Sequence, residues 1–330
     1  MKIALFNASQ SELNVINTWN ETHDDKIDVK EGVLTAENVD EVKGYQGIDL
    51  KQTVPLKDEE IYRKLHEFGL KSIGLRIVGT DIINIDLANK YKLKVTHVPV
   101  YSPRAIAEMA VTQAMYLLRH IGEFRENMDK NGDFTYPDEL ISDEIFNKTV
   151  GLIGVGNIGS AVAQIFSALG AKVLAYDVVY NPANEPFLTY TDFDTVIKES
   201  DIISLHTPLL PSTTNMIGEK ELKEMKNSAY LINCARGGLI DTQALISALK
   251  NHEISGAGLD TLADENSYFG LKVQKDKIPA DYKELAAMPN VVITPHSAFY
   301  TKTSVKNMVG ISAKDIIDVY NGKKSRNAIN

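Results

Sequence analysis

The stretch TVGLIGVGNIG at residues 149–159 decides the fold of this chain. Its first five residues form an apolar run typical of a buried strand, and a Gly-x-Gly-x-x-Gly turn from Gly154 to Gly159 follows directly. A helical pattern comes next, and a second apolar run, Lys172–Tyr176, ends just before Asp177. Strand, turn, helix and strand in this order predict a βαβ unit whose turn holds a dinucleotide.

Each residue of the turn has a physical task in such a unit. Gly154 allows the tight turn, Gly156 lets the backbone approach a pyrophosphate, and Gly159 permits close packing of the helix on the strand. The N–H groups at the start of the helix then face the phosphates. The carboxylate of Asp177 would accept hydrogen bonds from ribose hydroxyls and would repel a 2′-phosphate. We therefore predict NAD, in preference to NADP, as the cofactor.

Apolar, β-branched runs alternate with helical patterns along the whole chain. In chain order the runs are Lys2–Phe6, residues 73–77 and 95–98, then Thr149–Ile153, Lys172–Tyr176, Ile202–Leu205, and residues 229–233, 257–259 and 291–294. Such alternation predicts an α/β protein with two doubly wound parallel-sheet (Rossmann-like) domains and a cleft between them.

Two helical segments set the expected domain boundaries. One, from Ser102 to about Asn127, separates the two sets of strands, and the other, Thr301–Tyr320, should return to the first set. We therefore expect a discontinuous substrate (catalytic) domain, residues 1–101 plus 299–330, and an NAD-binding Rossmann domain, residues 102–298. The apolar face of the segment 102–127 is wider than one packing contact requires, so we expect a homodimer through this helix, with burial between the domains as the alternative.

The composition argues against several classes of binding partner. Lys and Arg number 35 against 44 Asp and Glu, and the net charge of -9 argues against nucleic acid or an anionic membrane. The amino-terminal apolar run is too short for a signal peptide, and the uncharged stretch 149–171 carries too many glycines for a membrane span. The single cysteine, Cys234, fits a reducing, cytoplasmic location. No spacing typical of a metal site occurs, so no metal is expected.

Residues able to do chemistry follow several of the expected strands. Because the carboxyl ends of parallel strands meet at one edge of a sheet, these segments should converge: His206-Thr207-Pro208, Cys234-Ala235-Arg236, Asp260 and Pro295-His296. A histidine suits proton delivery to a carbonyl oxygen as hydride reaches the carbon, because its ordinary pKa is ~6.5. Glu265 is the better carboxylate partner for His296, and Asp264 is its competitor. Arg236 offers a planar fork of donors that matches the carboxylate of a 2-oxo acid.

Taken together these residues resemble the D-specific 2-hydroxyacid dehydrogenases, and most closely the D-lactate dehydrogenase branch. The segments that carry the resemblance are residues 76–81, 98–103, 105–108, 154–159, 233–237 and 294–301, together with a long insertion between Glu265 and Pro289. They extend over nearly the whole chain and are far more specific than the glycine motif alone.

The resemblance implies roles for individual residues. Arg236 would bind the substrate carboxylate, His296 would donate the proton, and Glu265 would pair with His296. The backbone of Val78 and Gly79 would also hold the carboxylate, and Tyr101, Phe299 and Tyr300 would wall or flank the substrate pocket. The implied NAD positions are Asn157, Ile158, Asp177, Thr207, Pro208, Thr213, Cys234, Ala235 and Asp260. The residue pattern itself adds Gly154, Gly156 and Gly159 of the turn, and His206 as a residue that lines the cofactor cleft.

The resemblance therefore implies an oxidoreductase that reduces pyruvate to D-lactate with NADH. Residues 47–53 lack the aromatic side chain often found there in D-lactate dehydrogenases, and Thr213 stands where an asparagine is often found. A larger pocket would admit branched substrates, so a D-2-hydroxyisocaproate-type dehydrogenase is the alternative. A further alternative, from another class, is a non-catalytic NAD-sensing regulator on the same fold.

Overall fold

The computed structural model describes residues 1–52, 54–80 and 82–330, which form two compact units. Unit 1 consists of Met1–Ser102 and Tyr300–Asn330, and unit 2 consists of Pro103–Phe299. Each boundary lies one residue beyond the one expected from the sequence. Thr53 and Asp81, the last residues of the segments 47–53 and 76–81, lie outside the described residues.

Unit 1 is built on a parallel sheet with the strand order β2-β1-β3-β4-β5. Its strands are β1 (Lys2–Phe6), β2 (Lys26–Lys30), β3 (Gly47–Leu50), β4 (Ser72–Leu75) and β5 (Lys94–His97). Its α-helices are α1 (Gln10–Thr22), α2 (Glu59–Glu67), α3 (Ile85–Lys90) and α11 (Lys302–Tyr320), with a 3-10 turn at Val39–Val42.

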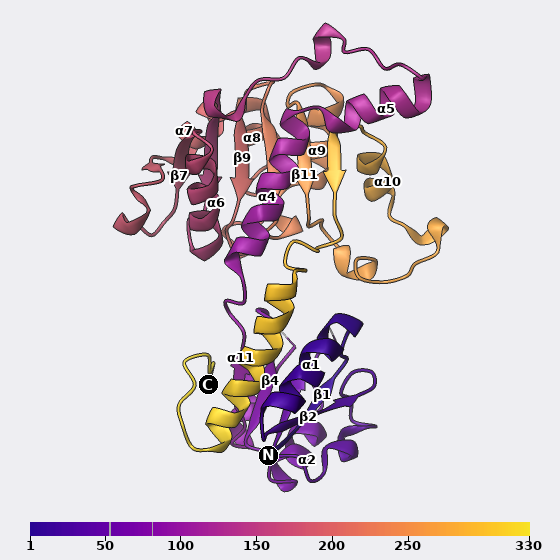
Figure 1. Cartoon of the computed structure of the whole chain (residues 1–330), viewed down its shortest axis with the longest axis vertical. Coiled ribbons are helices and arrows are strands. Elements are labelled where there is room, and N and C mark those ends of the chain that lie inside the picture. Colours follow the sequence, from indigo (N-terminus) through magenta and orange to yellow (C-terminus); the bar gives the residue numbers. More distant parts are fainter. Residues whose placement is uncertain (53, 81) are drawn as a thin grey trace. The chain divides into compact units, whose positions relative to one another are not determined.

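Both faces of this sheet are covered, which explains why β1 is apolar at nearly every position. Ile3 and Leu5 pack with α1 and α11 on one face, while Ala4 and Phe6 enter the core on the other face. Figure 1 shows α1 and α11 beside each other on the sheet. A Cβ at Gly47 would lie 2.2 Å from the side chain of Ile316, so the glycine lets α11 approach closely. The expected return of the C-terminal helix to the first set of strands is confirmed.

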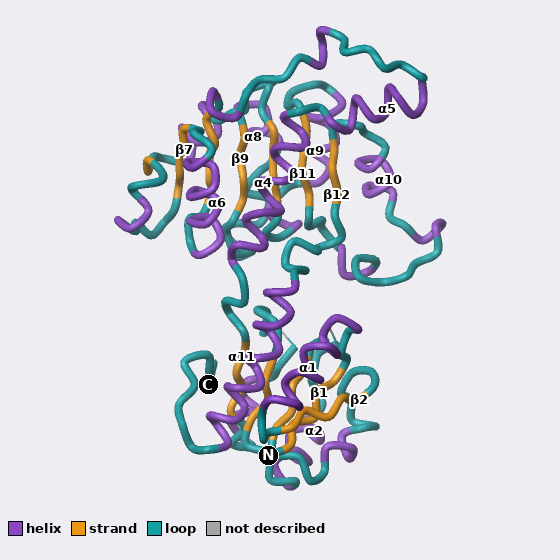
Figure 2. Tube along the Cα trace, viewed as in Figure 1, coloured by secondary structure: helices purple, strands orange, loops and turns teal. Residues whose placement is uncertain are grey.

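Unit 2 contains a larger parallel sheet with the order β12-β11-β10-β9-β6-β7-β8. Its strands are β6 (Thr149–Ile153), β7 (Lys172–Tyr176), β8 (Thr189–Tyr190), β9 (Ile202–Leu205), β10 (Tyr230–Asn233), β11 (Gly256–Leu259) and β12 (Val291–Ile293). Its α-helices are α4 (Pro103–Leu118), α5 (Ile121–Asn131), α6 (Asn157–Ala168), α7 (Phe193–Glu199), α8 (Glu219–Glu224), α9 (Thr242–Lys250) and α10 (Ala280–Ala286). Short 3-10 turns lie at residues 138–140, 145–147, 182–184, 237–239, 265–267 and 275–277. Figure 2 shows the strands of each unit flanked by helices.

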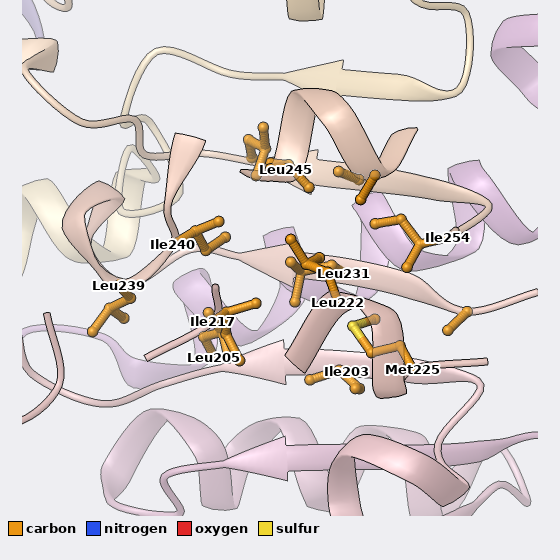
Figure 3. Packing of buried hydrophobic residues seen from close by; sticks show 14 of the residues in the cluster. Ile203, Leu205, Ile217, Leu222, Met225, Leu231, Leu239, Ile240, Leu245 and Ile254 are labelled. Atoms are coloured by element: carbon orange, nitrogen blue, oxygen red, sulfur yellow. The ribbon is translucent and has the colours of Figure 1, made fainter. Parts of the chain in front are cut away.

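One core of unit 2 lies between the sheet and the helices on one of its faces. Ile203 and Leu205 of β9 and Leu231 of β10 pack against Leu222 of α8 and Leu245 of α9 (Figure 3). All five side chains are almost fully buried. This rigid base fixes the carboxyl ends of the strands, where the candidate site residues follow.

The structure corrects several expectations about single elements. The helix expected from Ser102 to Asn127 is two helices, α4 and α5, because the backbone at His120 is left-handed (φ 49°). The glycine at position 122 then lies against the carbonyl oxygen of Pro289, which a Cβ would meet at 2.1 Å. The sequence patterns also missed β2, β3 and β8, which are short or carry charged residues.

Among the described residues, no helix has the length and apolar character needed to cross a membrane. The uncharged stretch 149–171 instead divides into β6, the glycine turn and α6.

Candidate active site

Three neighbouring strands of unit 2 are followed by candidate site residues. Arg236 follows β10, Asp260 follows β11 and His296 follows β12, and these strands are adjacent in the sheet. The convergence expected from parallel strand order is therefore present on this sheet.

His296 and Glu265 form the closest contact of the site. The Nδ1 atom of His296 lies 2.5 Å from Oε1 of Glu265, and the other carboxylate oxygen accepts the N–H of Leu262 at 2.7 Å. Because Glu265 is held from both sides, it fixes the orientation of the imidazole ring and leaves Nε2 as the nitrogen available to a substrate. Asp264, the competing partner, is exposed and has left-handed backbone.

Asp260 organises the turn that carries His296. Its backbone carbonyl accepts the N–H of His296 at 2.8 Å, and its carboxylate accepts the N–H groups of Ser297 and Ala298 at 2.9 and 3.0 Å. The hydroxyl of Thr294 donates to the same carboxylate at 2.5 Å. Burial raises the pKa of Asp260, and these donors act in the opposite direction. The left-handed backbone of His296 (φ 50°) is thus held in place by the turn.

Sequence reasoning missed Gln113, a buried polar residue of α4. Its Nε2 donates to Thr294 at 3.0 Å, and its Oε1 accepts the thiol of Cys234 at 3.5 Å. A chain of hydrogen bonds therefore leads from Cys234 through Gln113 and Thr294 to Asp260. The signal in the sequence was a glutamine among apolar residues of a helix. Burial raises the pKa of Cys234 well above its usual value, so the residue remains a thiol.

Arg236 lies in a turn that packs against the segment that contains Glu265. Asn233 accepts the N–H of Ala235 at 3.0 Å and donates to the carbonyl of Arg236 at 2.9 Å. A Cβ at Gly237 would lie 1.9 Å from the carbonyl carbon of Leu262, so the two backbones touch. The guanidinium is exposed, and within the described part of the chain it makes one hydrogen bond, from Nη1 to the carbonyl of Ala235 at 2.7 Å. Its remaining donors can receive a carboxylate.

The glycine turn has the geometry that a pyrophosphate requires. Gly154 has φ 90°, and a Cβ there would lie 2.8 Å from the carbonyl oxygen of His206. A Cβ on Gly159 would lie 2.1 Å from the carbonyl oxygen of Gly154. Among the residues that the structure describes, nothing lies within 4 Å of a Cβ on Gly156, which is the N-cap of α6 and provides no side-chain capping hydrogen bond. The first N–H groups of α6, at Asn157 and Ile158, can therefore receive phosphate oxygens, and these residues fit NAD.

Asp177 is held firmly at the end of β7. Its carboxylate accepts the N–H of Val155 at 2.6 Å and that of Val179 at 2.9 Å. The buried side chain of Asn184, which the sequence did not single out, donates to the carbonyl of Val155 at 3.2 Å. The carboxylate and the glycine turn therefore form one rigid piece.

The segment after β9 carries the remaining candidate cofactor residues. Burial lowers the pKa of His206 to about 4, so its ring is neutral, and Nε2 lies 2.9 Å from the hydroxyl of Ser204. Its Nδ1 is buried and has no hydrogen-bond partner among the described residues. Thr207 contacts the sulfur of Met216 at 3.6 Å, and Thr213 donates to the carbonyl of Pro208 at 2.7 Å.

Four of the expected substrate-binding residues belong to unit 1. Val78 and Gly79 follow β4, and Tyr101 accepts a hydrogen bond from Asn307 at its carbonyl, at 2.6 Å. The hydroxyl of Tyr300 lies 3.0 Å from that of Ser11. The other two, Arg236 and Phe299, belong to unit 2, and Phe299 is its last residue. Among residues 1–52, 54–80 and 82–330, no group of three or more His, Cys, Asp or Glu could hold a metal ion.

Comparisons with known proteins show the family to which this chain is similar. A family model for the NAD binding domain of D-isomer specific 2-hydroxyacid dehydrogenases matches residues 111–298. The chain is 40% identical over 333 residues to a D-2-hydroxyacid dehydrogenase (NAD(+)) of Clostridioides difficile, with 100% of both chains covered. Among solved structures, a D-lactate dehydrogenase with NAD+ from Lactobacillus jensenii is 64% identical, with a TM-score of 0.97. A D-isomer specific 2-hydroxyacid dehydrogenase from Lactobacillus delbrueckii ssp. bulgaricus, complexed with NAD, is 62% identical, with a TM-score of 0.96. Both cover 100% of each chain.

Proposed function

The chain belongs to the family of D-isomer specific 2-hydroxyacid dehydrogenases, and from that membership we propose that it reduces pyruvate to D-lactate. NADH, when bound at the glycine turn and Asp177, supplies the hydride that reaches C2 of the 2-oxo acid. We propose that unit 2 is the NAD-binding domain and unit 1 the substrate domain. The observation that carries the proposal is the 2.5 Å contact between His296 and Glu265.

In this proposal each residue of the trio has a separate task. Arg236 binds the substrate carboxylate through its free guanidinium donors, with the N–H groups of Val78 and Gly79 as further donors. His296 carries a proton on Nε2 and gives it to the carbonyl oxygen as C2 accepts hydride. Glu265 stabilises the positive charge of the ring before transfer, and solvent reprotonates the ring afterwards. The other cofactor residues proposed from the sequence would line the nucleotide.

The test is the turnover of purified His296→Ala with NADH and pyruvate, followed by the loss of NADH absorbance. Removal of a general acid should lower kcat by ~10²–10⁴-fold, while NADH binding, measured by fluorescence, stays unchanged. If the variant retains most of its turnover, the proposed mechanism is wrong. If the wild-type protein consumes no NADH with any 2-oxo acid, a nucleotide-sensing regulator is favoured instead.

A panel of 2-oxo acids of different size tests which substrate the protein prefers. The loop after β3 presents Lys51 and Gln52 and no aromatic side chain among its described residues. A higher kcat/KM for 2-oxoisocaproate than for pyruvate would assign the D-2-hydroxyisocaproate-type activity to the chain.

We further propose that the protein forms a homodimer. None of the residues Ile121–Asn131 of α5 is buried, and the segment after it exposes Phe134 (76%), Tyr136 (88%) and Ile141 (81%). Figure 2 shows this segment as loop with short helical turns. Exposed aromatic side chains in such numbers favour contact with a second copy over solvent. The expected surface is thus the α4–α5 region extended to residue 147, and light scattering after gel filtration tests it.

The buried single cysteine supports a cytoplasmic location.

A further inference from the structure

Two carbonyl groups in the loop after β4 accept hydrogen bonds from residues at the end of β5. The N–H of Val98 donates to the carbonyl of Ile77 at 3.0 Å. The Nδ1 atom of His97 lies 2.8 Å from the carbonyl oxygen of Val78. Since a carbonyl can only accept, Nδ1 is the protonated nitrogen in this contact.

These two hydrogen bonds fix the direction of two further N–H groups, those of Val78 and Gly79, which take no part in them. In a trans peptide the C=O of one residue and the N–H of the next lie in one plane and point in opposite directions. The bond from Val98 to the carbonyl of Ile77 therefore sets the direction of the Val78 N–H. In the same way, the bond from His97 to the carbonyl of Val78 sets the direction of the Gly79 N–H. Both N–H groups face away from β5.

The start of the loop is held by a buried arginine. Arg76 is fully buried directly after β4, and its Nε donates to Glu12 at 2.9 Å while Nη1 donates to Asp49 at 3.1 Å. Its Nη2 donates to the carbonyls of Phe6 and Asn7 at 2.6 and 3.0 Å. A buried ion network of this kind is weak evidence for stability, because apolar residues of similar volume often stabilise as well. It does fix the position of the chain at the point where the loop begins.

We propose that His97 is a positioning residue, which aims the backbone N–H of Gly79 at the substrate carboxylate while Arg76 anchors the start of the loop. The inference rests on the proposed function, in which Val78 and Gly79 hold that carboxylate. His97 does not touch the reacting atoms. Its effect is on substrate binding in both the ground state and the transition state, so it changes KM and leaves kcat nearly unchanged.

The experiment compares three variants at position 97 with the wild-type protein. His97→Ala and His97→Phe remove the donor, and His97→Asn keeps a side-chain N–H close to the place of Nδ1. The Ala and Phe variants should raise the KM for pyruvate about tenfold, with kcat within about threefold of wild type, because the loss is that of one charge-assisted hydrogen bond. The Asn variant should restore the KM. The affinity for NADH, which binds unit 2 in the proposed function, should be the same in all four proteins.

A matched control reports on simple loss of stability in unit 1. The side chain of Asn20 bonds both the N–H and the carbonyl of Ile27, at 2.8 and 2.9 Å, on the far edge strand of the sheet. Asn20→Ala should lower the melting temperature and leave the KM for pyruvate unchanged. An unchanged KM in His97→Ala, or an Asn variant as impaired as the Ala variant, overturns the positioning role while the proposed function stands. A wild-type protein without turnover overturns the proposed function itself.

Discussion

Removing the charge of Asp177 should change the choice between the two nicotinamide cofactors. The carboxylate cannot turn away from a 2′-phosphate, because the N–H groups of Val155 and Val179 hold it at 2.6 and 2.9 Å. Two unit charges about 4 Å apart repel by about 4 kcal/mol at an effective dielectric constant of ~20. Because Asp177 is half-buried, solvent screening should reduce this to about 2 kcal/mol, which is roughly a 30-fold discrimination against NADPH.

Asp177→Asn removes this charge and keeps one of the two hydrogen bonds, because an amide has a single acceptor oxygen and cannot also accept the N–H of Val179. The amide oxygen can still accept the N–H of Val155, so the glycine turn should keep its shape. The ratio of kcat/KM with NADH to that with NADPH should fall by roughly 30-fold, measured by the absorbance of the reduced nicotinamide at saturating pyruvate. Asp192→Asn is the matched control, because it removes an acidic N-cap of α7 elsewhere in unit 2 and should leave the ratio unchanged. A wild-type preference for NADPH, or an equal loss with both cofactors in Asp177→Asn, would refute the reasoning.

Three further outcomes are expected. Glu265→Gln should lower kcat by about 10- to 100-fold, because a charge-assisted hydrogen bond contributes about 1.5–3 kcal/mol, and single-turnover kinetics that match wild type would contradict this. Burial alone would raise the pKa of Glu12, but Arg76, Lys51 and the N–H of Ser9 lower this pKa to about 2. The ionised carboxylate therefore stabilises the fold fully above pH 4.5, and this stabilisation is lost as the pH falls toward 2. That contribution is roughly 3 kcal/mol, so Glu12→Gln should flatten the acid dependence of the unfolding free energy, and an equally steep curve would count against it. Gly237→Ala should destabilise unit 2 by about 1–3 kcal/mol and reduce turnover, because its Cβ would meet backbone atoms. Gly238→Ala should have a smaller effect on the melting temperature, because the three atoms nearest to its Cβ all belong to the flexible side chain of Leu209.

Local pattern was enough to predict the elements whose physics is local. The strand at residues 149–153 and the turn that follows it were predicted correctly, because a glycine turn between an apolar run and a helix has few other structures available. Local pattern could not predict that the helix ends at Leu118. Residues on both sides of His120 fit one helical period, and the contact of Gly122 with Pro289 depends on residues far apart in the chain.

The sequence by itself determined the parallel α/β architecture, the glycine turn with its acidic partner, and the set of strand ends that carry Arg236, Asp260 and His296. These follow from periodicity and from the rule that parallel strands end at one edge of the sheet. The sequence favoured Glu265 over Asp264 as the partner of His296, but only the tertiary structure shows the contact between the two side chains, since neighbours in sequence can point in different directions. The tertiary structure also decided that a glutamine of α4 supports the site and that His97 holds the loop after β4. The physical reason is that hydrogen bonds between distant segments depend on the packing of whole elements, which no local pattern encodes.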